Sequence, residues 1–276
     1  MSSWQALLGS LPFEWAQFAF MQNALLAVLI VAPLFALLGC MVINSQMAFF
    51  SDAMGHAALT GVAIGVLAGL ADPLWAMICF ALALTLLISW LRHHSAASID
   101  TVIGLTMSLA VALGVVLLSR GGGFARYTSY LVGDILTISA VEIRRLLILL
   151  GGVLVLWVIF FNRMFFVSLN ATLARSRAIR VGFMETLFAM IVALVVTVSI
   201  PWVGLLVINA LLIVPAAAAR NLARNMPQYI WGAVAISLAS GMAGLVASFY
   251  WDTAAGATIV LFAMGCFVLS LCCRRR

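Results

Sequence analysis

Long apolar runs separated by short polar turns follow one another along almost the whole chain. A window of about 18 to 20 residues, the length at which a helix crosses a bilayer, finds about nine of them. Because a helix satisfies its own backbone hydrogen bonds in hydrocarbon, the pattern predicts an all-α, polytopic membrane protein with about eight or nine transmembrane helices. The predicted crossings lie near residues 15–38, 48–70, 74–91, 101–119, 146–161, 183–200, 203–219, 230–249 and 254–271.

The composition agrees with this fold and limits what else the chain contains. Of the 276 residues, 66% are hydrophobic and 8% are charged, against roughly 25% charged in soluble domains. We therefore expect a single transmembrane domain over residues 1–276, with no sizeable soluble part. Any ATPase or ligand-capturing activity would then belong to another chain, and no permanently bound cofactor is expected.

Motifs of the common enzyme and nucleotide-binding classes are absent from the sequence. No HExxH, GxSxG or Walker pattern occurs, which argues against the commonest hydrolases and ATPases. The five cysteines have no CxxC spacing, so they predict neither a disulfide framework nor a zinc knuckle. The net charge of +6 is an indication of membrane topology, not of nucleic-acid binding.

The positions of the arginines predict how the chain is oriented. Placing the N-terminus outside puts ten of the fourteen basic residues on the inner side. This bias agrees with the positive-inside rule, so we expect an odd number of crossings and a cytoplasmic C-terminus. The inner group is Arg92, Arg163, Arg175, Arg177, Arg180, Arg220, Arg224, Arg274, Arg275 and Arg276, and the outer group is Arg120, Arg126, Arg144 and Arg145.

Three stretches do not fit a plain crossing. The run at residues 120–145 is too long for a turn and too broken for a span, and it predicts a short half-buried helix near residues 130–136. Residues 201–215 carry a proline at each end and Asn209 inside, which leaves open a broken or re-entrant helix and an ordinary proline-kinked one. The polar insertion at residues 162–180 permits a short surface helix that docks a cytoplasmic partner, or simple anchoring of its arginines to phosphates.

Asp52 and His56 stand near the start of an apolar, glycine-spaced run, SDAMGHAALTGVAIGVLAG. Residues four apart share one face of a helix, so the carboxylate and the imidazole can converge on one point. An ionisable residue in a membrane segment is a functional-site hypothesis by default. Both side chains are ligands for zinc, manganese or iron, and two of them suit a transient site better than a structural one. The alternative is a helix cap, because Ser51 and Asp52 also suit a helix N-terminus.

Five motifs, taken in order, resemble those of the ABC-3 family, the permease subunits of bacterial zinc, manganese and iron ABC importers. The resemblance covers nearly the whole chain, and the agreement of several motifs in order and spacing makes it far more specific than any one of them. It implies a fold like that of type II ABC importers. The motifs are MAFFSDAMGHAALTGVAIG (47–65), IDTVIGLTMSLAVALGVV (99–116), SYLVGDIL (129–136), VGLLVINALLIVPAAAARNLA (203–223) and YWDTAAGATIVL (250–261).

The resemblance also implies partners and site residues. It implies a homodimeric permease in the bacterial inner membrane, served by an extracytoplasmic metal-binding protein and by a cytoplasmic ATP-binding subunit that hydrolyses ATP. The ion-contacting pair would be the aspartate and the histidine described above. The ATPase-coupling segment would lie within residues 162–181, with Ala174, Arg175 and Ile179 as its contacts, although several flanking residues depart from the family pattern.

Two other functional classes are compatible with parts of the sequence. A secondary metal/proton transporter would use Asp52 and His56 as a proton relay, but it would favour several intramembrane acids or an internal repeat. An intramembrane metalloenzyme would need about three protein ligands and a general base, which the chain does not offer. We therefore expect a transport subunit, not an enzyme, with a divalent metal ion as its cargo, zinc or manganese being favoured and iron possible.

Overall fold

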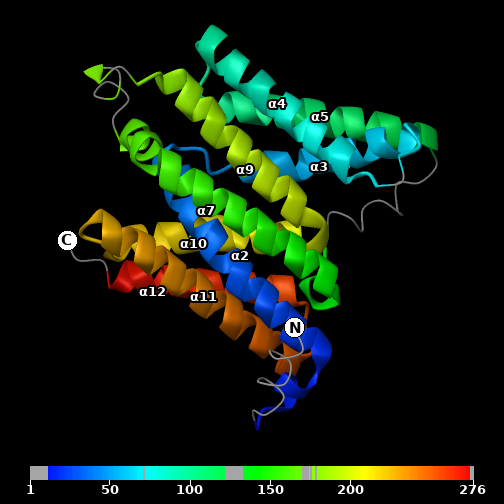
Figure 1. Cartoon of the computed structure of the whole chain (residues 1–276), viewed down its shortest axis with the longest axis vertical. Coiled ribbons are helices and arrows are strands. Elements are labelled where there is room, and N and C mark those ends of the chain that lie inside the picture. The colour runs from blue at the N-terminus through cyan, green and yellow to red at the C-terminus, as the bar shows by residue number, and fades with distance from the viewer. Residues whose placement is uncertain are drawn as a thin grey trace. The chain divides into compact units, whose positions relative to one another are not determined.

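The computed structural model describes residues 12–70, 72–121, 133–169, 174, 176–177 and 179–273. Within these ranges all regular structure is helical (Figure 1). Nine of the described helices are long and apolar enough to cross a membrane, and each overlaps one predicted crossing in the same order. The predicted all-helical fold is therefore confirmed.

The transmembrane candidates are α2 (Ala19–Asn44), α3 (Phe50–Leu67), α4 (Leu74–His94), α5 (Ile99–Gly121), α7 (Ala140–Leu169), α9 (Val181–Val203), α10 (Leu205–Leu222), α11 (Met226–Trp251) and α12 (Ala255–Cys272). Two short 3-10 helices, η1 (Glu14–Gln17) and η2 (Ile135–Thr137), precede α2 and α7. The first predicted crossing began at residue 15, whereas the α-helix begins four residues later, after η1.

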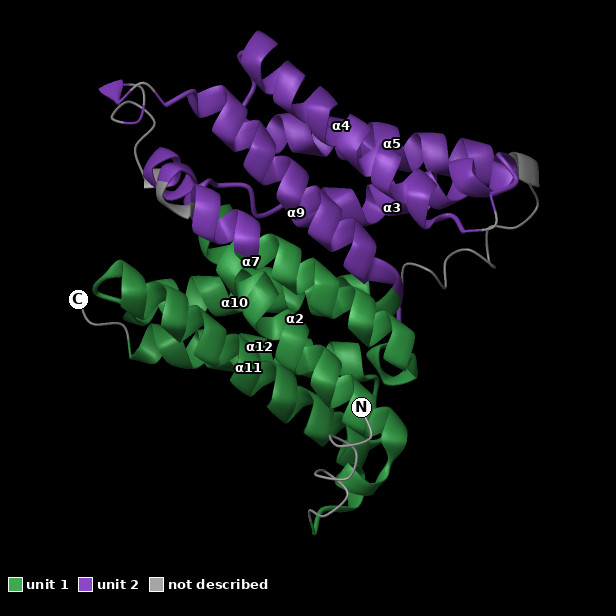
Figure 2. Ribbon diagram, in the orientation of Figure 1, with its two compact units in different colours: residues 1–43, 134–154, 202–276 green, residues 44–133, 155–201 purple. Residues whose placement is uncertain are grey.

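The chain divides into two compact units (Figure 2). Unit 1 contains α2, the first half of α7, α10, α11 and α12, and unit 2 contains α3, α4, α5, the second half of α7 and nearly all of α9. This division does not test the expectation of a single transmembrane domain, which stays a prediction. The units comprise Met1–Ile43, Asp134–Leu154 and Trp202–Arg276, and Asn44–Gly133 and Val155–Pro201, respectively.

In unit 1, helices α10, α11 and α12 pack against one another, and α2 joins them through small side chains. A Cβ atom on Gly39 of α2 would lie 1.8 Å from the carbonyl oxygen of Leu212 on α10, so the two backbones are in direct contact. The hydroxyl of Ser237 on α11 donates a hydrogen bond to the carbonyl of Ala32 on α2, at 3.0 Å. Close approach at small residues and hydrogen bonds between helices are the usual means of association in a membrane.

In unit 2, α3 packs against both α4 and α5. A Cβ atom on Gly61 would lie 2.5 Å from the Cα atom of Met77 on α4. On the other side, the hydroxyl of Thr60 donates a hydrogen bond to the carbonyl of Ala110 on α5. Helix α3 is therefore held closely on two sides, and this packing determines which of its side chains remain accessible.

The stretch at residues 201–215 is not interrupted at its prolines. Pro201 lies inside α9 and Pro215 lies inside α10. The break falls at Gly204, whose φ of 87° is a conformation that glycine reaches without a steric penalty. The stretch is thus broken once, at Gly204, and helical through Pro215, and α10 is long enough to count as a crossing.

The polar insertion at residues 162–180 begins as part of α7. This helix runs to Leu169, about two turns beyond its predicted end near residue 161. Residues 162–169 therefore extend a transmembrane helix. The surface helix expected around Leu173 and Ile179 falls on a segment that the structure describes only in part, so it stays a prediction. Residues 130–132 of the helix expected near residues 130–136 lie outside the described residues. In the described part, from residue 133 on, the structure has only the short 3-10 helix η2.

Candidate functional site

Asp52 and His56 lie in the first two turns of α3 and share one face of it. The Nε2 atom of His56 is 3.9 Å from the Oδ2 atom of Asp52. This separation is within the range of an ion pair but is longer than a hydrogen bond. The exposed fractions of the two side chains are 39% for His56 and 38% for Asp52. The predicted convergence of the carboxylate and the imidazole is confirmed, and their role in transport stays a prediction.

The burial of the surrounding helix distinguishes this pair. From Phe50 to Ala63, every residue except Asp52 and His56 is buried. The next residues along the same face, Leu59 and Ala63, are buried as well. The accessible strip on this part of α3 is therefore short and consists of two side chains that can coordinate a metal ion.

The helix-cap alternative does not fit the register of α3. The N-cap residue is Phe49, whose side chain makes no capping hydrogen bond. The hydroxyl of Ser51 instead donates to the carbonyl of Ala48, at 3.4 Å. Asp52 is the third residue of the helix, a position at which a negative charge interacts favourably with the helix dipole. Asp52 is therefore not the N-cap residue itself, and its role at the start of the helix stays a prediction.

The pair alone is an incomplete metal site. In the part of the chain that the structure describes, no group of three or more His, Cys, Asp or Glu side chains is placed to hold a metal ion. Structural zinc sites use four protein ligands and catalytic ones use three. Asp52 and His56 thus offer two ligands, fewer than either kind of zinc site uses.

A second acid–base pair joins α4 to α9. The Nη1 atom of Arg92 is 3.0 Å from Oε2 of Glu185, and its Nη2 atom donates to Oε1 at 3.2 Å. Beside this bidentate contact, the hydroxyls of Ser89 and Thr186 share a hydrogen bond. Sequence reasoning missed the pair, because it used Arg92 only to infer topology. Glu185 is an acid inside an apolar run, the same signal that drew attention to Asp52.

The predicted coupling residues fall in a segment that the structure describes only in part. Ala174 is buried, and its carbonyl accepts hydrogen bonds from the backbone N–H groups of Arg177 and Ile179, at 3.2 and 3.1 Å. The second of these bonds spans five residues, as in a helix C-terminal cap. Ile179 is half-buried, and Arg175 lies outside the described residues. The coupling role of all three contacts stays a prediction.

Comparison with known proteins places this chain among transport proteins. The ABC 3 transport family matches residues 17–274. The chain belongs to this family. It is 33% identical over 260 residues to the high-affinity zinc uptake system membrane protein ZnuB of Haemophilus influenzae, a match that covers 92% of this chain and 97% of that protein. It is 32% identical over 256 residues to the manganese import system permease protein ScaB of Streptococcus gordonii, over 92% and 91% of the two chains.

A solved structure shows the same fold over almost the full length. PsaBC from Streptococcus pneumoniae, determined in complex with Fab, matches with a TM-score of 0.80 and 29% identity, covering 98% of this chain and 95% of that chain. The resemblance inferred from the five motifs is therefore confirmed, and as a member of a transport family the chain is not itself an enzyme. The alternative of a secondary metal/proton transporter finds no support in these similarities.

Proposed function

We propose that the chain is the membrane-spanning permease subunit of an ABC importer for a divalent transition metal ion, with zinc or manganese favoured over iron. The observation that carries the proposal is the accessible Asp52–His56 pair on an otherwise buried stretch of α3. It occurs in a chain that is similar over its length to a zinc uptake protein and to a manganese import protein. Imidazole and carboxylate are ligands that both metals accept.

A homodimer would complete the ligand set of the transported ion. Two copies related by a two-fold axis bring the same residues together, so they would place two carboxylates and two imidazoles around one point. Four such ligands suit a divalent transition metal. The accessibility of both side chains in the single protomer supports this arrangement, because each still has surface to offer to an ion and to a second copy.

The energy for import would come from a separate cytoplasmic ATP-binding subunit, and an extracytoplasmic metal-binding protein would deliver the ion. The sequence has no Walker motif of its own. We place the contact with the ATP-binding subunit at Ala174, Arg175 and Ile179. The two backbone hydrogen bonds accepted by the Ala174 carbonyl support this placement, since they order the chain between Ala174 and Ile179 just before α9.

We also propose that the protein resides in the inner membrane of a bacterial cell, with its N-terminus outside and its C-terminus inside. Nine described helices of spanning length and the inner excess of arginine support this orientation. Under it, the segment between α7 and α9 faces the cytoplasm, where an ATP-binding subunit can reach it.

Metal uptake in cells that lack other importers tests the proposed function. Expression of the chain together with its ATP-binding and metal-binding partners is expected to restore accumulation of radiolabelled zinc or manganese. An ATP-binding subunit that cannot hydrolyse ATP serves as the matched control and should abolish this uptake. Uptake that persists with the inactive subunit, but is lost when the proton gradient is dissipated, would contradict the proposal and favour a secondary transporter.

A further inference from the structure

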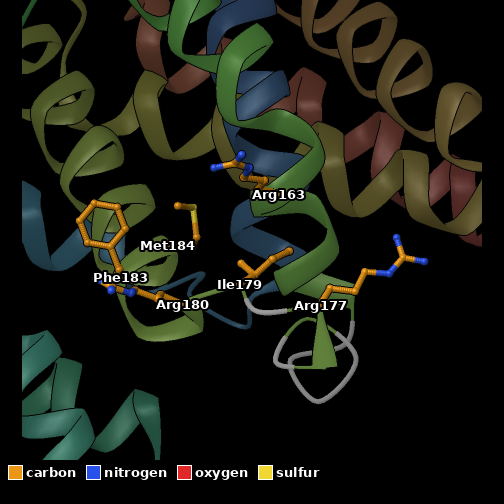
Figure 3. A pocket seen from close by; sticks show the side chains of 6 residues that line it. All are labelled: Arg163, Arg177, Ile179, Arg180, Phe183 and Met184. Carbon is orange, nitrogen blue, oxygen red and sulfur yellow. The ribbon is translucent and has the colours of Figure 1, made fainter.

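A basic cavity lies in unit 2 beside the C-terminal end of α7 and the start of α9 (Figure 3). Its volume is about 450 Å³. Three of the described residues that line it are arginines, three are apolar, and none is acidic: Arg163, Arg177, Ile179, Arg180, Phe183 and Met184. The cavity therefore combines a strong positive charge with an apolar wall.

The positive charge of this cavity is not balanced by nearby carboxylates. Within the described part of the chain, none of its three arginines forms an ion pair. The acid closest in sequence, Glu185, is engaged by both terminal nitrogens of Arg92. The guanidinium of Arg177 lies 4.6 Å from the ring centre of Phe166, and Figure 3 shows this side chain extending away from the other five. Arg163 and Arg180 are exposed and remain to bind an anion.

We propose that this cavity binds the phosphate headgroup of an anionic phospholipid from the inner leaflet. The forked guanidinium of arginine matches the oxygens of a phosphate. Phe183 and Met184 supply the apolar surface that the glycerol and first acyl carbons of a lipid require and that a free phosphate does not. Basic pockets between transmembrane helices on the cytoplasmic side are a recurrent site for such headgroups.

The size of the cavity favours a lipid headgroup over a protein as its occupant. Pockets of roughly 300 to 1,000 Å³ accommodate small molecules, and this one falls within that range. A specific protein interface buries about 800 Å² on each partner and involves some 20 to 30 residues a side. Six lining residues are too few to form such an interface by themselves.

Lipid retention tests this site without metal or ATP, and so independently of the proposed import function. The full-length protein is purified from membranes in a mild detergent, and the phosphatidylglycerol that stays bound is quantified per mole of protein by mass spectrometry. We expect Arg163→Gln and Arg180→Gln to lower retention by about five-fold each, and the double variant to lower it further. The matched control is Arg144→Gln, which removes an exposed arginine near the other end of α7 and should leave retention unchanged.

Thermal unfolding in nanodiscs identifies the source of the phosphate. Phosphatidylglycerol, added to nanodiscs of phosphatidylcholine, should raise the Tm of the wild type and of the Arg144→Gln control by the same amount. It should raise the Tm of each single variant less, and that of the double variant least. Equal retention by the double variant and the Arg144→Gln control would overturn the proposal. So would an equal rise in Tm with inorganic phosphate alone, which indicates a free-anion site. The proposal would also be overturned if the double variant kept its lipid but no longer copurified with the ATP-binding subunit. That result would assign the cavity to a protein interface.

Discussion

The described part of unit 2 contains two acid–base pairs in helices of spanning length, and they differ in separation, in exposure and in the helices that they join. Asp52 and His56 lie on one helix, 3.9 Å apart, with more than a third of each side chain exposed. Arg92 and Glu185 come from two helices, approach to 3.0 Å, and are 28% and 23% exposed. The first pair is placed by helix geometry alone, whereas the second holds two helices together.

The chemistry of the basic partner separates the two pairs further. A neutral imidazole can donate a nitrogen lone pair to a metal ion, whereas a guanidinium has donors only and stays charged. Arg92 therefore neutralises Glu185 and keeps other cations away from it. His56 leaves the carboxylate of Asp52 accessible to a cation and adds a ligand of its own, so an ion path is expected along this pair and not along the other.

The largest effect is expected from breaking the pair on α3. Asp52→Asn and His56→Ala should each lower zinc or manganese uptake by about 100-fold or more, because loss of a direct ligand exceeds the 10- to 100-fold cost of losing an outer-shell partner. Uptake of labelled metal, normalised to protein in the membrane fraction, is the measurement. Asp100→Asn, an acid in the first turn of α5, and His94→Ala, an exposed histidine, are the matched controls. Near-normal uptake by the α3 variants would contradict an ion site at this pair. The remaining role of Asp52 would then be its favourable interaction with the helix dipole.

Breaking the pair between α4 and α9 should affect stability before transport. Arg92→Gln or Glu185→Gln leaves one partly buried charge without its partner, which we expect to cost about 2 to 3 kcal/mol of stability. Thermal unfolding in detergent measures this loss, and the exchanged variant Arg92→Glu/Glu185→Arg should recover part of it. A single variant that unfolds like the wild type yet fails to transport would assign this pair to the ion path as well.

A smaller loss should follow from disturbing the packing that keeps α3 in place. Gly61→Ala puts a methyl group 2.5 Å from the Cα atom of Met77, and the resulting overpacking should cost about 2 kcal/mol. Gly104→Ala on α5 meets no atom within 4 Å and is the control. The Tm of the two variants is the readout. Equal values would mean that α3 tolerates displacement, and that the accessibility of its pair does not depend on this contact.

The smallest effect is expected from the predicted coupling residue Arg175. Arg175→Glu should weaken binding of the ATP-binding subunit by about 1 kcal/mol, because it reverses a charge at the contact. Copurification of that subunit should therefore fall several-fold, while insertion in the membrane stays intact. Arg144→Glu reverses a charge on the predicted outer side and should have no such effect. If copurification and uptake are both unchanged in the Arg175 variant, the contact belongs elsewhere, with residues 220–225 as the next candidate.

Most of the fold was predictable from the sequence because hydrocarbon forces the backbone into helices. Nine apolar runs therefore correspond to nine described helices. The boundaries were less predictable, since a helix does not end where the hydrocarbon ends: α7 continues past the polar residues Asn162 and Arg163 to Leu169. The break between α9 and α10 was predicted at residues 201–202 but lies at Gly204, because Pro201 is the stronger signal in sequence and is accommodated inside α9.

The two acid–base pairs show which part of a site a sequence can reveal. The spacing of four residues between Asp52 and His56 is enough to predict that they share a face. The contact between Arg92 and Glu185 joins residues 93 positions apart, and it depends on how α4 and α9 pack, which no local pattern encodes. For the same reason, the burial of the rest of α3, which makes its pair conspicuous, became visible only in the structure.

Metal binding to the purified permease, without its ATP-binding subunit, tests the Asp52–His56 site most directly. Calorimetry in nanodiscs with zinc or manganese should show one ion per dimer for the wild type and for Glu185→Gln. Binding should be lost in Asp52→Asn and in His56→Ala, provided that both elute as folded dimers. Unchanged binding in these two variants, or a loss that also appears in Glu185→Gln, would contradict the assignment of the ion site to α3.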